Sequence, residues 1–195
     1  MMTNGKFYLF GGKFHDDRAF STFFCLDLQT FSWQNLYESN QINKIEHSLL
    51  PIGDYIVIFG GYEGKKIYNE IILYDIKHNK ISEVKPKNKT TKHRYGHSAI
   101  FHQGEMIIYG GRDAQNILKD MWSFSFLNYE WTLINYTGII KPLFRHSCIK
   151  MDEYFLIFGG AIDHQSYSSS LYLVDLETHE ITNIKKLEDK PIARC

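Results

Sequence analysis

The chain has 195 residues, of which 44% are hydrophobic, 15% aromatic and 23% charged. Such a composition excludes a disordered chain and a coiled coil, and the length suffices for one domain or one repeat array with a buried core. The 22 basic and 22 acidic side chains balance, so bulk charge gives no reason to expect binding to nucleic acid or to an anionic membrane.

The sequence carries no sign of export or membrane insertion. The N-terminal residues lack the apolar segment of a signal peptide, and no run of about 18 apolar residues occurs anywhere in the chain. Cys25, Cys148 and Cys195 are odd in number and far apart, which fits neither a disulfide framework nor a zinc site. We therefore expect a cytoplasmic protein without a membrane span.

An apolar segment that ends in a glycine pair occurs four times, at residues 6–12, 55–61, 105–111 and 154–160. The first glycines of these pairs follow one another at steps of 49, 50 and 49 residues. Further landmarks keep this register: a His-Ser pair lies 13 residues before three of the glycine pairs, and an Asp follows three of them. These landmarks are His47, His97 and His146, and Asp27, Asp75 and Asp175, with Ser125 at the remaining Asp position. Several landmarks at one period indicate a repeat protein.

Each repeat contains four short segments with strand-like patterns, which in the third repeat are residues 97–102, 105–111, 120–126 and 129–135. The second segment is almost continuously apolar in every repeat, which predicts burial on both of its faces. Tight links join the first and second segments, as in β-hairpins. Because no stretch keeps a helical period, we predict four-stranded antiparallel meanders that recur about every 50 residues.

These features resemble kelch repeats, which have four strands and a period of about 50 residues. The glycine pairs, the Tyr74-Asp75 dipeptide before a six-residue gap, and Trp33 and Trp131 carry the resemblance. WD repeats are the nearest alternative, but they are shorter and have a Trp-Asp dipeptide that this chain lacks. Residues 94–98 and the Pro-x-x-Arg of residues 142–145 resemble the branch of Rab-effector-like and tip-elongation-like kelch proteins.

The chain departs from the kelch pattern at two kinds of position. Ile81 and Ile181 stand where a Trp is expected, and the first repeat lacks most of its first strand. Both departures weaken individual repeats and leave the family resemblance intact.

The resemblance implies an all-β fold, a kelch-type β-propeller whose four-stranded antiparallel blades stack on one another. We expect one propeller region over residues 1–195, with repeats at about 1–44, 45–93, 94–143 and 144–190, and with 191–195 as the start of a further repeat. Kelch propellers typically have six or seven blades, so we expect the ring to be incomplete in this chain. The end blades would then expose apolar faces, which predicts self-association through these faces.

Most of the repeated residues are expected to serve the scaffold. A glycine pair at the end of a buried strand permits unusual φ angles and the close approach of an aromatic side chain. Trp33, Trp131 and the three repeated histidines are predicted to lie in the core, because a catalytic group usually occurs once rather than in every repeat.

The sequence gives no pattern typical of an enzyme. Residues 60–66 have neither the spacing nor the following helix of a phosphate-binding loop, and no Cys-x-x-Cys metal pair or nucleophile elbow occurs. His93 and His97 are four residues apart, but on an extended segment this spacing does not bring the two side chains together as it would on a helix. We therefore predict no catalytic residues, no metal and no cofactor. The alternative is a propeller enzyme such as the galactose oxidase type, in which Tyr and His bind copper.

Function is expected on the loops at one rim of the propeller. In a meander of strands A to D, the B–C and D–A connections share a rim, and here they are long and dissimilar between repeats, as recognition loops are. Aromatic and Arg side chains are favoured at binding sites. The candidate partner-binding residues are His15, Arg18, Tyr62, Lys65, Lys66, Arg112, Asp113, Gln115, His164 and Tyr167.

These observations predict a non-catalytic interaction module that docks a protein partner on the loop rim. One D–A connection, residues 85–94, is locally basic and suits an acidic partner better than nucleic acid. A further alternative is the substrate-recognition part of a ubiquitin-ligase adaptor, which would need another domain or subunit.

Overall fold

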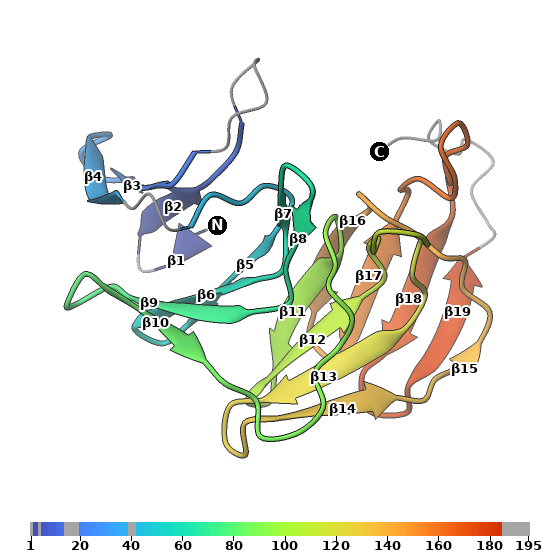
Figure 1. Ribbon diagram of the computed structural model, residues 1–195. Helices are drawn as coiled ribbons and strands as arrows, with labels where there is room; N and C mark the ends of the chain where they lie inside the picture. Colours follow the sequence, from blue (N-terminus) through green and yellow to red (C-terminus); the bar gives the residue numbers. More distant parts are fainter. Residues whose placement is uncertain (1, 4, 14–19, 39–41, 185–195) are drawn as a thin grey trace. The chain divides into compact units, whose positions relative to one another are not determined.

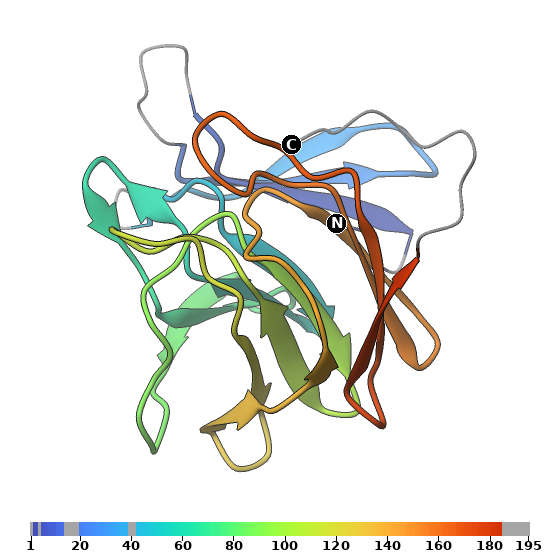
Figure 2. The same ribbon diagram turned by 90° about the vertical axis from the view of Figure 1, so that its right-hand side faces the viewer.

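The computed structural model describes residues 2–3, 5–13, 20–38 and 42–184. These residues form strands and turns with no helix (Figures 1 and 2). The described part of the chain thus contains no helix that could cross a bilayer. The chain divides into two compact units, Met1–Lys85 and Pro86–Cys195, and each unit contains two four-stranded meanders, which we call blades 1 to 4 in chain order.

The first unit contains blades 1 and 2, whose neighbouring strands are all antiparallel. Blade 1 consists of β1 (Met2–Thr3), β2 (Lys6–Phe10), β3 (Thr22–Asp27) and β4 (Trp33–Glu38). Blade 2 consists of β5 (Ser48–Ile52), β6 (Tyr55–Phe59), β9 (Ile71–Asp75) and β10 (Lys80–Val84). Between β6 and β9 the chain forms a small hairpin of β7 (Tyr62–Glu63) and β8 (Lys66–Ile67).

The second unit contains blades 3 and 4, again as antiparallel meanders. Blade 3 consists of β11 (Ser98–His102), β12 (Glu105–Tyr109), β13 (Met121–Ser125) and β14 (Glu130–Ile134). Blade 4 consists of β16 (Ser147–Met151), β17 (Tyr154–Phe158), β18 (Leu171–Asp175) and β19 (Glu180–Ile184). The short strand β15 (Thr137–Gly138), in the connection between these blades, pairs with β19 in parallel. The four strands predicted in the third repeat match β11 to β14 to within one residue at their ends, apart from the glycine pair that follows β12.

Each unit has its own core, formed where its two blades pack face to face. In the first unit, Phe23 stacks on Phe10 of blade 1 and on Tyr74 of blade 2, with ring centroids 4.6 and 4.3 Å apart. In the second unit, residues of blade 3 such as Ile107 pack with Phe155 and other residues of blade 4 in one buried cluster. Stacked blades of this kind bury sheet faces that a lone four-stranded meander would leave in water.

The predicted burial of the second strand on both faces is confirmed for β6 and β12 only. In these two strands every residue but the first is buried. In β2 and β17 the alternate residues remain accessible, for example Leu9 with 43% of its surface exposed. Side chains alternate between the faces of a strand, so in β2 and β17 one face is buried and the other remains accessible.

The prediction that both tryptophans lie in the core is right for Trp131 and wrong for Trp33. Trp131 is 3% exposed and packs on Phe124, with ring centroids 5.1 Å apart. Trp33 is 55% exposed, and its ring contacts are edge-on with Phe7 and Phe24 of its own blade. Trp33 occupies the repeat position of the buried Trp131, but it lies on the accessible face of blade 1, which the other blade of its unit does not cover.

The repeated histidines have the scaffold role expected of them, and the glycine pairs explain why. A Cβ atom on Gly160 would lie 2.7 Å from the Cβ of His146, and one on Gly110 would lie 3.3 Å from Cε1 of the same imidazole. His146 therefore lies between the second glycine of its own blade and the first glycine of the preceding blade. His47 has the corresponding place, because a Cβ on Gly61 or Gly11 would lie 2.9 or 2.7 Å from its side chain.

The repeated Asp shapes the turn between the third and fourth strands. In three blades its Oδ1 accepts hydrogen bonds from the backbone N–H groups two and three residues later, at 2.8 to 3.0 Å. In blade 3, Ser125 Oγ accepts a single bond of 3.3 Å from Asn128. A side-chain acceptor of this kind replaces backbone partners in a tight turn.

Candidate functional site

The loop rim is built where the end of each D–A connection pairs with the start of the next B–C loop. Single β-bridges join Ile45 to Tyr62, Tyr95 to Arg112 and Phe144 to Ala161. In blades 2 to 4, the residue directly after the glycine pair is thus fixed by backbone hydrogen bonds to the segment that leads into the first strand of the same blade. We use the term loop rim for residues 42–46 and 62–70 in the first unit, and for 91–96, 112–120, 141–145 and 161–170 in the second.

In the first unit the loop rim carries an ordered aromatic and basic cluster. The Nζ atoms of Lys44 and Lys66 lie 4.1 and 4.6 Å from the ring centroid of Tyr68. The Tyr68 hydroxyl donates a hydrogen bond of 3.0 Å to Glu63, and burial together with this carboxylate raises the pKa of Tyr68 to about 12.

The candidates Tyr62, Lys65 and Lys66 all belong to the β7–β8 hairpin of this cluster. Tyr62 is half-buried in β7, whereas Lys65 and Lys66 are exposed. The candidates His15 and Arg18 lie outside the described residues.

In the second unit two candidates from different blades meet. The guanidinium of Arg112 lies beside the imidazole of His164, with Nη2 3.3 Å from Nε2 and Nη1 3.5 Å from Nδ1. The guanidinium carbon of Arg112 also lies 5.8 Å from the ring centroid of Phe144, and that of Arg145 lies 5.4 Å from it. Two cations, an imidazole and an aromatic ring therefore share this part of the loop rim. Cation–π contacts of this kind hold an Arg in place without neutralising its charge.

Asp113 stabilises the conformation of its own loop through hydrogen bonds with the backbone. Its Oδ1 accepts hydrogen bonds from the backbone N–H groups of Gln115 and Asn116 at 2.8 and 2.6 Å, and Lys92 Nζ lies 3.4 Å from its Oδ2. Burial alone would raise the pKa of Asp113, but these bonds lower it. Asp163 repeats the turn in blade 4 by accepting bonds from Gln165 and Ser166.

The remaining candidates, Gln115 and Tyr167, occupy different places on these two loops. The side chain of Gln115 is exposed next to the Asp113 turn. Tyr167 is 46% exposed, and its backbone pairs with Ala161 across the B–C loop of blade 4.

The basic connection of residues 85–94 presents less charge than the sequence suggests, because Arg94 is fully buried. Its guanidinium donates two hydrogen bonds of 2.9 Å to the carboxylate of Asp120 and another of 2.9 Å to the carbonyl oxygen of Gly110. The lysines of the connection are exposed. Lys92 is held near Asp113, and the neighbouring Asn88 exchanges two hydrogen bonds with the backbone of Trp131.

The buried ion pair was not recognised from the sequence, although the sequence contains a signal for it. Lys44 and Glu70 form the corresponding pair in blade 2, and in both blades the partners are 26 residues apart. In blade 4 the equivalent residues are Leu143 and Ser170. A charged pair at the same register in two repeats is the pattern that could have revealed it.

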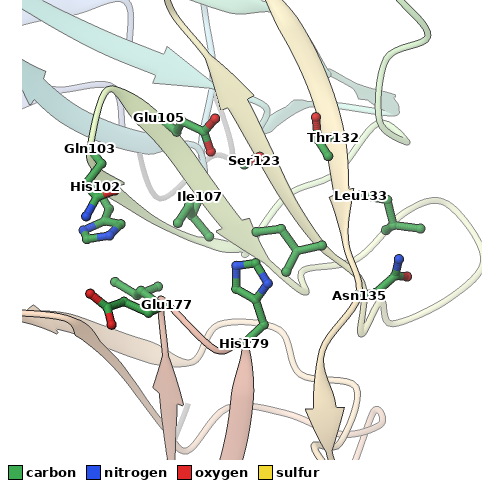
Figure 3. Close-up of a pocket in the computed structure, with 12 residues that line it drawn as sticks. His102, Gln103, Glu105, Ile107, Ser123, Thr132, Leu133, Asn135, Glu177 and His179 are labelled. Carbon is green, nitrogen blue, oxygen red and sulfur yellow. The ribbon is translucent and has the colours of Figure 1, made fainter.

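A pocket of about 650 Å³ in the second unit lies at the opposite ends of the strands, where no candidate residue was predicted. It is lined by the β11–β12 turn, the outer strand β14 and the turn after β18. Figure 3 shows Glu177 and His179 facing the residues of blade 3 across this pocket. His102 lies at its edge, with Nε2 3.3 Å from Oε2 of Glu153. Among the described residues, no three His, Cys, Asp or Glu side chains are placed to hold a metal ion.

The sequence comparisons agree with this architecture. The family model described as the KLHDC2/KLHL20/DRC7 Kelch-repeats domain matches residues 1–160. This chain belongs to the kelch-repeat family. The predicted kelch resemblance and the all-β kelch fold are confirmed, whereas the assignment to a Rab-effector-like or tip-elongation-like branch and the repeat boundaries stay predictions.

Curated relatives of this kelch chain come from plants and animals. It is 25% identical to Acyl-CoA-binding domain-containing protein 5 of Arabidopsis thaliana over 97% of the chain and 32% of that protein. It is 26% identical to human Kelch domain-containing protein 3 over 78% of the chain and 44% of the relative, and 27% identical to Kelch domain-containing protein 10 of Rattus norvegicus over 83% and 42%. The chain therefore spans less than half the length of these relatives.

Proposed function

We propose that this kelch chain is a non-catalytic interaction module of the cytoplasm that docks a segment of a partner protein on its loop rim. The observation that carries the proposal is the grouping of Arg112, His164, Phe144 and Arg145 from two blades of the second unit. The kelch names of the relatives support a module that binds proteins rather than one that catalyses a reaction.

The chemistry of this grouping favours a partner segment with an acidic side chain. A guanidinium offers a planar fork of donors that matches a carboxylate. The contacts with His164 and Phe144 restrict the motion of the Arg112 guanidinium before any partner binds, which lowers the entropic cost of binding. The nearby aromatic surface of Tyr167 supplies a side-chain type that is enriched at interfaces.

The proposal is tested by capture of the tagged chain from cells in which it is expressed, with mass spectrometry of the proteins that co-purify. We compare the wild type with Arg112→Ala and Tyr167→Ala, and with Lys80→Ala as a control outside the loop rim. Lys80 is exposed at the start of β10, next to the turn between the third and fourth strands of blade 2. We expect a protein that binds the wild type and the control to be reduced at least tenfold on both loop-rim variants.

The variants also locate the site within the rim. A Tyr62→Ala variant reports on the first unit, because Tyr62 belongs to the β7–β8 hairpin. A partner retained equally by the variants at Tyr62, Arg112 and Tyr167 would show that the loop rim is not the docking surface. For a partner that is lost, Arg112→Lys is expected to recover part of the binding, because it restores the charge without the planar fork.

A further inference from the structure

Blade 4 exposes an apolar face. Paired residues on its four strands share this face, with Ile149 opposite Leu156 and Leu156 opposite Leu173. Ile149 is 59% exposed, and Leu156 and Leu173 are half-buried. The face also carries Met151, Tyr154, Phe158, Leu171 and Ile184, each of which is exposed or half-buried.

The repeat shows what kind of surface covers such a face. In blade 3 the equivalent residues of Ile149, Leu156, Phe158, Leu171 and Ile184 are Ile100, Ile107, Tyr109, Met121 and Ile134. All five of these blade 3 residues are buried in the core that blade 3 forms with blade 4. We call this side of a blade its following face, because it packs against the next blade along the chain.

Blade 1 exposes the opposite type of face. Phe7 pairs with Leu26, and Leu26 pairs with Trp33; together with Leu9 and Phe24 they form an exposed or half-buried apolar surface. The equivalents of Phe7, Leu9, Phe24 and Leu26 in blade 2 are Ile56, Ile58, Ile72 and Tyr74. These four residues are buried against blade 1, so this side of a blade is its preceding face.

The two exposed faces are thus the two halves of one type of contact. Within each unit, a following face packs against a preceding face: blade 1 against blade 2, and blade 3 against blade 4. The following face of blade 4 and the preceding face of blade 1 both lack a partner blade from their own unit. Contiguous exposed apolar surfaces mark association sites on proteins.

We propose that the chain self-associates head to tail, with the following face of blade 4 of one copy packed on the preceding face of blade 1 of another copy. The occupant is a second copy because each face repeats the residue pattern of a contact that the chain already makes between its own blades.

This inference is independent of the proposed function, because the contact uses sheet faces and the partner is proposed to bind the loop rim. The variants that test the two proposals are different, so either proposal can fail alone. An Arg112→Ala chain should still self-associate, and a chain that cannot self-associate still carries its loop rim.

The first experiment measures molar mass by size-exclusion chromatography with light scattering across a range of chain concentrations. We expect the molar mass of the wild type to rise above its chain mass of 22.9 kDa as the concentration rises. Leu156→Asp on blade 4 and Leu9→Asp on blade 1 should each weaken association at least tenfold, because a charge would enter an apolar contact. Leu127→Asp is the matched control, since Leu127 is an exposed leucine of the β13–β14 turn.

The second experiment mixes the two variants and separates a head-to-tail contact from a symmetric one. In the mixture, the intact blade 4 face of the Leu9→Asp chain can meet the intact blade 1 face of the Leu156→Asp chain. We expect a one-to-one complex in the mixture although each variant alone is monomeric. A symmetric contact between two blade 4 faces would instead leave the Leu9→Asp chain dimeric on its own.

Three results would overturn the proposal. They are a wild type that stays monomeric at all concentrations, single variants that associate like the wild type, and a mixture that does not recover association. Circular dichroism and thermal melts of each variant establish that it is folded, and Leu9→Ser with Leu156→Ser repeats the comparison if an Asp variant does not fold.

Discussion

The imidazole of His146 takes up the volume that side chains at two glycine positions would need. The glycine pairs and the repeated histidines therefore form one packing device, in which the glycines leave the space that the imidazole occupies. The ring of His146 also contacts Tyr109 edge-on at 5.5 Å and lies with Nε2 2.7 Å from the hydroxyl oxygen of Ser98. His47 contacts Phe10 in the same way at 5.3 Å, so the device recurs in both units.

The first prediction concerns the close approach at Gly160. Replacement of Gly160 by Ala would place a Cβ 2.7 Å from the Cβ of His146 and 3.0 Å from the carbonyl oxygen of Phe144, at a φ of 87°. Gly104→Ala is the control, because Gly104 has a φ of 85° and no atom within 4 Å of the added Cβ. We expect a loss of about 1 kcal/mol for Gly104→Ala from the backbone alone, and about 3 kcal/mol for Gly160→Ala.

Urea unfolding at pH 7 measures both losses. Equal losses for the two variants would mean that the backbone conformation, and not the contact with His146, requires glycine at residue 160.

The second prediction is a pH dependence that originates at the same histidine. Burial lowers the pKa of His146 from 6.5 to about 4, against a smaller opposing effect of a backbone hydrogen bond at Leu143. Since the unfolded chain then binds more protons between these two values, the unfolding free energy falls as the pH drops from about 6.5 to about 4. The expected contribution is up to about 3 kcal/mol, at roughly 1.4 kcal/mol for each unit of pKa difference.

Thermal melts between pH 7 and pH 4.5 test this dependence in the wild type, in His146→Gln and in His93→Gln, which changes an exposed imidazole. We expect a shallower fall of stability with pH in His146→Gln and the wild-type slope in His93→Gln. The Asp residues of the turns have lowered pKa values because of their backbone hydrogen bonds, so their contribution disappears at lower pH than this window. An unchanged slope in His146→Gln would remove the histidine from the explanation.

At the scale of the blade, two local structural features differ from one repeat to another. The turn between the third and fourth strands has an Asp in three blades and Ser125 in blade 3. The entry to the first strand has a buried ion pair in blades 2 and 3, and Leu143 with Ser170 in blade 4. Substitution of one version for another tests what each feature contributes.

The third prediction is that Ser125→Asp stabilises the chain at neutral pH. Asp at this position can accept two backbone N–H bonds, whereas Ser125 accepts one long bond from Asn128. We expect the melting temperature to rise by about 2 °C at pH 7 and the gain to disappear as the pH is lowered below about 4, where the carboxylate is protonated. Ser125→Asn is the control, because it supplies an acceptor without a charge and should keep its gain at low pH.

The fourth prediction concerns Arg94 and Asp120. Asp120→Ser alone should destabilise the chain by about 3 kcal/mol, because it leaves a buried guanidinium without its carboxylate. The double variant Arg94→Leu with Asp120→Ser copies blade 4 and should be more stable than Asp120→Ser. Urea unfolding of both variants measures this difference, and a double variant that is less stable than Asp120→Ser would show that the other hydrogen bonds of Arg94 matter more than its charge.

The contrast between what the sequence predicted and what it missed is clear at this scale. The apolar runs and hairpin links predicted the long strands, because alternation and turn residues act locally. The β7–β8 hairpin was not predicted, because two-residue strands are too short to show an alternating pattern. The strand β15 is equally short, and it pairs with β19, which is distant in sequence. The burial of Trp33 and of Arg94 was misjudged for a related reason. Burial depends on which face of a blade another blade covers, and the identity of a single residue does not indicate this.

The candidate site was predictable only in part. The sequence placed Arg112 and His164 on loops of one rim, since connections at the same ends of strands meet there. Their contact with each other, and the contact of Arg112 and Arg145 with Phe144, require the twist and spacing of two blades. The pocket beside Glu177 and His179 had no signal in the sequence, because its walls come from short turns and strand ends with ordinary polar residues.

At the scale of the whole molecule, each unit has its own core, and apolar faces of blade 1 and blade 4 remain accessible. Trp33 lies on the accessible face of blade 1, whereas Trp131 is buried in blade 3. A repeat protein stabilises each repeat through its contacts with neighbours, so an uncovered face is the part of the array that gains most from another copy. Trp33 is therefore a natural reporter of head-to-tail association.

The fifth prediction follows from the position of Trp33. If the preceding face of blade 1 is covered in the associated state, acrylamide should quench Trp33 less at high chain concentration than at low concentration. The difference between the wild type and Trp33→Phe isolates this residue from Trp122 and Trp131. In the Leu156→Asp chain, which keeps Trp33 but loses the opposing face, quenching should be strong at every concentration. If Trp33 is quenched equally in the wild type and in Leu156→Asp at concentrations where the wild type is associated, then the copies meet through another surface, and the exposed apolar face of blade 1 needs a different occupant.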